Sequence, residues 1–520
     1  VLDLIREHPR PLRPGSLREG EGSDGEGTVP AEATAPAGSA PTGAAPPWHL
    51  RLGILPFMGA HAARRRFPSA SHLFPSRFTV LVRWDGRGDL EHFLLRDAQD
   101  GRRVGIRQSM HQIAVTDEYV VLLDSAFEIG LSSLLSNFFP DGAISERLRR
   151  TPGSLGDRGI DRVERFLRAR VTAPNLTVGS VYFVRRADLE TTQERSAVKP
   201  LEWRVVTARR VDLPGPVVHF LADPDDRGGT RVVLHVVHQS CTDVSLWLSN
   251  FDRDFDGNPP AQDLLGMLPA PMDLSRLARY AIDPRTGQVL EHKEVARDPE
   301  FWELALLAGP GLGTLKGAPR RHRFAIYYAI GFWSELATEF VFDLYRDDPQ
   351  RTVSPERVRD TIAAEGRWTQ LIRVDLDSLE IVDSYTLDVT DPGPMGPVGR
   401  MLGSPQFIPR HEDSDLLDGW ISALCYRDAA VDLLIFDAAH LAGGPLCTLA
   451  LPREVDPGFL LHSAWLPRIG PRQATYRVDP AVDYEHPLRP SPTRAGRIVE
   501  RIFQQDAVRD AFERFVKSPP

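Results

Sequence analysis

The sequence is poor in cysteine and in long apolar runs. It has 3 cysteines in 520 residues, and none of them forms a CxxC pair. An odd number without such a pair argues against a disulfide framework and against a zinc site built on thiolates, and it favours a reducing cytoplasm as the compartment. No run of about 18 apolar residues occurs, so we expect no membrane-spanning helix.

Positive charge and the common nucleotide-binding and hydrolase motifs are also scarce. The chain has 62 basic and 71 acidic residues, a net charge of −9, and the basic residues are scattered rather than gathered into a stripe. Nucleic acid is therefore not an expected partner. There is no P-loop, no GxGxxG opening a helix after a strand, no GxSxG and no HExxH. These absences disfavour phosphoryl transfer, nicotinamide chemistry and serine hydrolysis, and they leave zinc-dependent hydrolysis as a weaker alternative.

The N-terminal region has the composition of a linker. Residues 13–47 consist mainly of Gly, Pro, Ala, Ser and Glu. Such a segment cannot bury enough apolar surface to offset the entropy lost on ordering. We therefore expect a disordered segment over 1–50 and a folded domain over 51–520.

Short β-rich runs separated by Asp-Gly turn signals begin near Phe78. The first runs are FTVLVRW, LEHFLLRD, RRVGIRQ and HQIAVTDEYVVLLD, and they predict an antiparallel meander. Residues 369–388 predict a hairpin, and residues 418–452 predict three consecutive strands. Repeated meanders without an exact sequence repeat favour an all-β propeller, with a large sandwich or two β domains as alternatives.

One helical segment between the meanders is amphipathic. Its apolar residues recur at i, i+3, i+4, i+7 and i+8, which places them on one helix face. This face either packs on its own domain or forms an apolar rim that admits a substrate and touches a membrane surface. The residues are Leu131, Leu134, Leu135, Phe138 and Phe139.

Three histidines lie in or beside apolar β-like runs, where an imidazole needs a partner: His111, His235 and His462. Each alone reads best as a hydrogen-bonded core residue, but three such sites indicate a metal centre, since neutral imidazole is a common ligand of iron, copper and zinc. His238 follows His235 by three residues, and side chains three apart in a strand point to opposite faces. Only one of this pair is therefore expected to bind a metal. An acyltransferase HxxxD motif does not fit, because His238 to Asp243 is one residue too long.

These segments resemble the carotenoid cleavage oxygenase family, which includes the lignostilbene dioxygenases. His111 with IAVTDEYVVLLD is similar to the family's segment at its second metal ligand, and His235 is similar to the third, although His238 stands where the family has Asn. The run SPQFIPRHEDSDLLDGWISALCYRD, LLIFDAAHLAGGP and LHSAWLP resembles the family's ending, with His462 as the fourth ligand.

The resemblance implies a seven-bladed β-propeller with a small helical cap, one Fe(II) per chain held by four histidines, and catalysis at that iron. The implied reaction uses O2 to cleave a C=C bond of an apolar conjugated substrate, a carotenoid, apocarotenoid or stilbene, to two carbonyl products. The alternative is a catalytically impaired propeller that binds an apolar ligand or a protein partner.

The N-terminal part departs from the family pattern. His61 lies in an Ala-His pair 50 residues before His111 and is the expected first ligand, with His72 as its rival, but the family's Pro, Asp and Thr-Gly do not follow His61. The resemblance thus implies a truncated or atypical N-terminal region that lacks part of the first blade, and the absence of the first ligand is the third alternative beside His61 and His72. Ser404 stands where the family has a carboxylate that holds a ligand histidine, and Glu335 and Glu339 are the candidate substitutes.

Overall fold

The computed structural model describes residues 78–84, 90–126, 168, 172, 174–192, 203–308, 321–387, 401–411, 414, 416–427, 430–452, 455 and 461–466. All of these except Trp84 belong to one compact unit, which comprises Leu55–Arg83 and Leu90–Pro471. The linker expected over 1–50, the amphipathic segment with Leu131 and Phe139, and the candidate ligands His61 and His72 lie outside the described residues. The expectations for them, including the domain boundary near residue 50, stay predictions.

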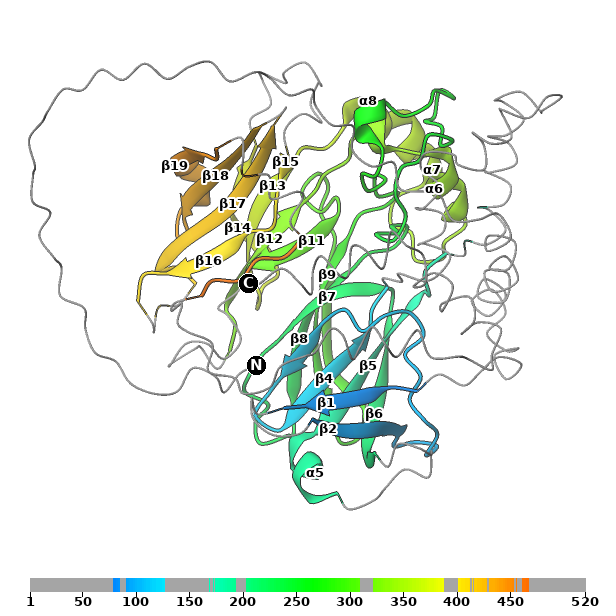
Figure 1. The fold of residues 1–520 in the computed structure, drawn as a ribbon, viewed down its shortest axis with the longest axis vertical. Coiled ribbons are helices and arrows are strands. Elements are labelled where there is room, and N and C mark those ends of the chain that lie inside the picture. Colours follow the sequence, from blue (N-terminus) through cyan, green and yellow to red (C-terminus); the bar gives the residue numbers. More distant parts are fainter. Residues whose placement is uncertain are drawn as a thin grey trace, which may run out of the picture. The chain divides into compact units, whose positions relative to one another are not determined.

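The described strands form four sheets (Figure 1). The first has the order β1 (Val80–Arg83), β2 (Glu91–Asp97), β6 (Arg204–Pro214), β5 (Val178–Arg185), β4 (Tyr119–Asp124), β3 (Ile113–Val115). The second has the order β10 (Gln288–Val295), β9 (Arg276–Asp283), β8 (Val232–His238), β7 (Val217–Ala222). The third has the order β11 (Leu304–Ala308), β12 (Phe324–Ala329), β13 (Gln370–Asp375), β14 (Glu380–Thr386). In the fourth, β15 (Met401–Leu402) and β16 (Gln406–Pro409) both pair with β17 (Gly419–Arg427), which is followed by β18 (Ala430–Asp437) and β19 (Pro445–Ala450).

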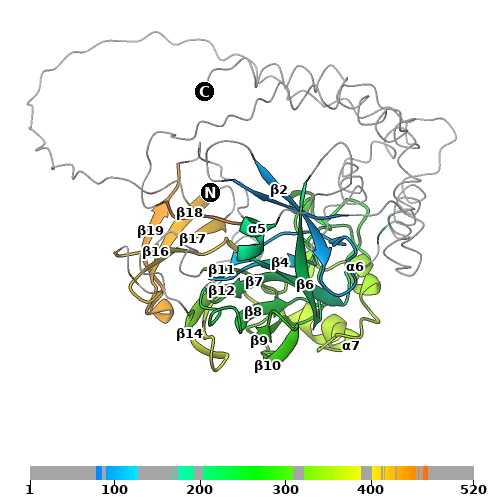
Figure 2. The ribbon, with the colours of Figure 1, turned by 90° about the horizontal axis from the view of Figure 1, so that it is seen from below.

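One edge strand of each sheet contacts an edge strand of the next. β3 contacts β7, β7 contacts β11, and β11 contacts β16. Sheets that meet in series through their edge strands are the blades of a propeller, and Figure 2 shows β7 near both β4 and β11, with β8, β9 and β10 following it outward. The prediction of an all-β propeller with few helices is confirmed. The described residues contain four of its sheets, so the count of seven blades stays a prediction.

The hairpins expected from local signals are present. Residues 369–388 form β13 and β14, and residues 418–452 form β17, β18 and β19, all antiparallel. Between β13 and β14, the N–H groups of Asp377 and Ser378 donate to Asp375 Oδ1, a turn that the Asp side chain specifies locally.

The simple meander expected at the start of the domain is wrong in two respects. β2 pairs in parallel with β6, more than 100 residues later in the chain. The run RRVGIRQ forms no strand, because the N–H groups of Arg107 and Gln108 donate to the buried Asp124 carboxylate at 3.0 and 2.8 Å instead of to a neighbouring strand. Both deviations come from long-range partners that local pattern does not reveal.

Helices are short. Thr338 caps α6 (Glu339–Leu344) by accepting a hydrogen bond from the Val341 N–H. Among the described residues, no helix is long and apolar enough to cross a membrane. The other helical elements are α5 (Arg186–Thr191), η2 (Gln262–Leu264), η3 (Ser334–Leu336), α7 (Pro355–Arg357), the π-helical turn η4 (Val358–Ile362), α8 (Ala363–Glu365) and η6 (Leu441–Gly443).

Candidate metal centre

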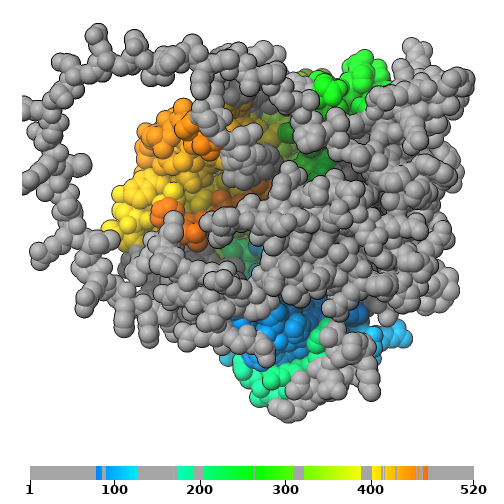
Figure 3. Space-filling view, in the orientation of Figure 1, coloured from blue at the N-terminus to red at the C-terminus, as the bar shows by residue number. Residues whose placement is uncertain are grey.

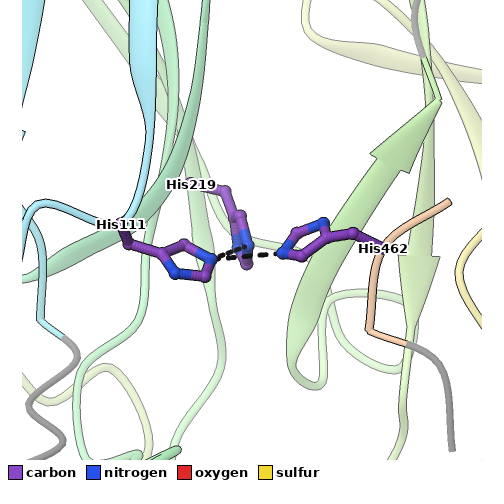
Figure 4. Close-up of side chains that lie close together, drawn as sticks. All are labelled: His111, His219 and His462. Carbon is purple, nitrogen blue, oxygen red and sulfur yellow. Dashed lines mark hydrogen bonds between the residues drawn. The ribbon is translucent and has the colours of Figure 1, made fainter. Parts of the chain in front are cut away.

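Three histidine side chains from distant parts of the chain converge on one point (Figure 4). His111 precedes β3, His219 lies in β7, and His462 lies in the segment 461–466. His111 Nε2 is 3.1 Å from His219 Nε2 and 3.2 Å from His462 Nε2. The ligand atoms of these three histidines all lie within 4.8 Å of one another, so they could hold a metal ion. No other group of three His, Cys, Asp or Glu side chains in the described part of the chain does so.

The edge strands of the first two sheets bring His111 and His219 together. Gln112, next to His111, accepts a hydrogen bond from the Phe220 N–H at 2.9 Å, and Phe220 is the neighbour of His219. This bond couples the two ligand-bearing segments directly. His462 comes from a segment that is exposed along its length and is seen at the surface in Figure 3.

Hydrogen bonding among the three imidazoles cannot satisfy all of them. Each ring nitrogen carries either one hydrogen or one lone pair, whereas His111 Nε2 faces two other Nε2 atoms. A cation at the centre would accept one lone pair from each ring. Two nitrogens bound at about 2.1 Å and at right angles around one ion lie about 3 Å apart. The observed separations of 3.1 and 3.2 Å fit that arrangement.

Removal from water, nearly complete for His219 and partial for His111 and His462, favours the neutral form of the three rings. It lowers the pKa of His219 to about 3, with His111 and His462 adding to the effect. Burial and His462 lower the pKa of His111, and burial lowers the pKa of His462. All three are therefore unprotonated near neutral pH, which is the form of histidine that binds metals.

A cavity of about 310 Å³ lies beside the three histidines. Two of its lining residues, Trp247 and Leu461, are 41% and 45% exposed, so the cavity reaches the surface. Apart from the histidines, most of its wall is apolar. The lining consists of His111, Val218, His219, Gln239, Val244, Ser245, Trp247, Gly266, Met267, Leu268, Pro269, Ala270, Pro271, Glu303, Ala305, Ile330, Gly331, Trp333, Leu336, Met401, Leu461 and His462.

Glu303 is a buried carboxyl in this wall that sequence reasoning missed. It precedes β11 with a φ of +53°, a backbone conformation that non-glycine residues adopt rarely and often at functional sites. Burial raises its pKa to about 8. Within the described residues, neither Glu303 Oε1 nor His219 Nδ1 has a hydrogen-bond partner, and both residues line the cavity. A carboxylate on the second ring nitrogen is the usual support of a metal-binding histidine.

The carboxylates suggested by the sequence lie elsewhere. Glu335 is exposed on η3, and its Oε2 accepts a hydrogen bond from Ser334 Oγ. Glu339 begins α6 and lies 3.8 Å from an Arg359 nitrogen. Neither residue lines the cavity.

The structure does not bring His235 to the cluster. Its Nε2 lies 3.3 Å from Asp223 Oδ1, an oxygen that also accepts the His322 N–H at 2.9 Å. On the opposite face of β8, His238 Nε2 lies 2.9 Å from Tyr280 Oη, so the two side chains diverge as strand geometry requires. The physical reason is that β8 is the second strand of its sheet, between β7 and β9, and its side chains pack between sheets.

His219 occupies the place expected for His235. It lies in the apolar run VVHFLA, a setting like that of the three histidines selected from the sequence, and this signal could have found it. The residue three positions later is Ala222, so the His-x-x-Asn pattern does not mark it. Only its position in the edge strand β7 separates it from other buried histidines.

Comparisons with known proteins give the family. A family model described as retinal pigment epithelial membrane protein, RPE65, matches residues 93–467. Similar solved structures include a mutant of Synechocystis apocarotenoid oxygenase (ACO), with 16% identity over 72% of this chain and 55% of that chain and a TM-score of 0.36. They also include cobalt-substituted Synechocystis ACO, with 18% identity over 70% of this chain and 52% of that chain and a TM-score of 0.35.

A third similar structure is an ACO/RPE65 chimera, with 14% identity over 72% of this chain and 57% of that chain and a TM-score of 0.36. The chain thus spans little more than half the length of these structures. No curated protein matches this sequence. Because the family model covers more than half of the chain, the protein belongs to the RPE65 family, the carotenoid oxygenase family that its sequence resembles.

Proposed function

We propose that the protein is a non-haem dioxygenase that uses one Fe(II) to cleave a C=C bond of a carotenoid, apocarotenoid or stilbene-type substrate to two carbonyl products. The observation that carries the proposal is the convergence of His111, His219 and His462 beside a largely apolar cavity. The fourth ligand comes from His61, with His72 as its rival.

The donor set suits this chemistry. Imidazole nitrogens bind iron well, and the ligand nitrogens of the three neutral rings lie within 4.8 Å of one another, so one ion could bind all three. Bound Fe(II) would supply the activation of O2 next to an uncharged alkene. With His219 instead of His235 as the third ligand, the donor is still an imidazole, as the sequence led us to expect. Only the strand that provides it differs, β7 instead of β8.

The chain's own residues would bind and position the substrate. The apolar wall, which includes Met267, Trp333 and Leu336, would hold a conjugated hydrocarbon next to the histidines and exclude water. Glu303, whose Oε1 has no hydrogen-bond partner among the described residues, would hold the His219 ring by its Nδ1. His111 and His462 would stay neutral because burial lowers the pKa of each.

The test is a metal and product analysis of the full chain. The protein is purified without O2, loaded with Fe(II), and assayed for iron per chain, O2 uptake and aldehyde products with a carotenoid and with 4-hydroxystilbene. One iron per chain together with aldehyde formation is expected. A chain that binds no iron contradicts the proposal, and activity that persists without O2 indicates metal-dependent hydrolysis instead.

A matched pair of variants tests the ligand assignment. His219→Gln should abolish stoichiometric iron binding, because an amide is a poor substitute for an imidazole on this ion. His235→Gln should keep the iron, since its side chain faces Asp223 and an amide N–H can still donate to that carboxylate. Equal loss of iron in both variants would show that His235 also acts on the metal centre.

A further inference from the structure

Gln239 is a buried polar residue of the cavity wall whose side-chain amide has no hydrogen-bond partner in the part of the chain that the structure describes. Gln239 follows β8, and its main-chain N–H donates to the Pro216 carbonyl at 3.0 Å, which fixes its position. Its side chain is almost completely buried, at 2% exposed, and lines the cavity. Within the described residues, neither Oε1 nor Nε2 of this amide is paired.

The other buried polar side chains of the wall already have a role. Ser245 Oγ donates to Asp243 Oδ1 at 2.6 Å, and the Ser245 N–H donates to the same oxygen at 3.1 Å. The three histidines form the metal centre, and Glu303 is assigned above to His219. The Gln239 amide is therefore the polar group of the wall that is left for a ligand.

A buried amide needs a partner, and here the partner must come from the cavity. A polar group buried without a hydrogen bond costs free energy that a paired one does not. Water in the cavity can pair with the amide when no ligand is bound. A hydrocarbon that displaces this water leaves the amide unpaired, whereas a ligand with a hydroxyl or carbonyl group replaces the lost hydrogen bonds.

We propose that Gln239 determines ligand specificity, and that the cavity takes an apolar molecule with an uncharged hydroxyl or carbonyl group placed against this amide. Among the described lining residues there is no Lys or Arg, so away from the iron that the histidines would hold, a ligand carboxylate would find no countercharge. At about 310 Å³, the cavity lies near the lower end of the range of small-molecule sites, which favours a compact ligand. The inference rests on the proposed function only in identifying this ligand as the substrate.

The test measures equilibrium binding of two probes that differ only in one hydroxyl group. The full chain is titrated without O2 with trans-stilbene and with trans-4-hydroxystilbene, so that no turnover occurs. We expect the hydroxylated probe to bind about tenfold more tightly, since one hydrogen bond to a buried amide is worth about that factor. In Gln239→Met, which keeps the length of the side chain and removes the amide, this preference should disappear.

Met267→Leu is the matched control, because Met267 lines the same cavity and is apolar before and after the change. It should shift both affinities alike and keep the preference. Equal affinities of the unmodified chain for the two probes, binding of neither, or a preference that survives in Gln239→Met would overturn the inference. Iron binding is measured in parallel. If the unmodified chain binds no iron, the proposed function is refuted, and not this inference.

Discussion

His238 makes the stability of this protein depend on pH in a direction and an amount that can be worked out. The side chain is fully buried on β8, with its Nε2 2.9 Å from Tyr280 Oη. Burial, assisted by the charge of Arg276, lowers its pKa from 6.5 to about 3. In the unfolded chain the histidine is hydrated and its pKa returns to about 6.5.

The unfolded chain therefore takes up a proton as the pH falls through 6.5, whereas the folded protein does so only near pH 3. The stability that depends on neutral His238 is complete above pH 6.5 and is lost progressively between pH 6.5 and pH 3. Between pH 8 and pH 5 the loss amounts to about 2 kcal/mol, at about 1.4 kcal/mol per pH unit below 6.5.

The assay is denaturant unfolding of the metal-free chain at pH 8 and pH 5, compared with the variant His238→Gln. Glutamine does not titrate, and its amide can still form a hydrogen bond with Tyr280 Oη. On acidification, the free energy of unfolding of the unmodified chain should fall by about 2 kcal/mol more than that of the variant. An equal fall in both proteins would refute the reasoning, because no proton uptake could then be assigned to His238.

Two further predictions concern buried ionisable groups. Glu303→Gln should weaken iron binding by about 10- to 100-fold, as removal of a carboxylate behind a metal-binding histidine usually does, and competition with a chelator would measure it; an unchanged affinity would exclude Glu303 from supporting the centre. Arg168 Nη1 lies 2.7 Å from Asp252 Oδ1 with both side chains buried, so Asp252→Asn should destabilise the protein by about 3–5 kcal/mol in denaturant unfolding. A loss below about 1 kcal/mol would show that the pair is effectively solvated.

The class of fold could be read from short-range pattern, because strands and tight turns are specified by neighbouring residues. The hairpin of β13 and β14 follows from two β-rich runs and the Asp375 turn between them. The alternating buried positions of β17 likewise have the period of two that a half-buried strand requires. The parallel pairing of β2 with β6 had no such signal, since the partners are far apart in the chain.

The candidate site also contains residues that could be recognised from the sequence and residues that only the structure identifies. His111 and His462 stand in segments that could be recognised from their neighbours, and the structure brings both together. The apolar run around His219 could have added it to the candidates, but neither His219 nor Glu303 could be assigned to the site, because a buried histidine or glutamate looks alike in sequence whether it faces a cavity or a packed core. Their position depends on which strand lies at the edge of its sheet: β7 and β11 do, whereas β8, with His235, lies one strand further in. That choice is made by long-range strand pairing, so the sequence indicated histidines as candidate ligands, and only the tertiary structure placed His219 beside His111 and His462.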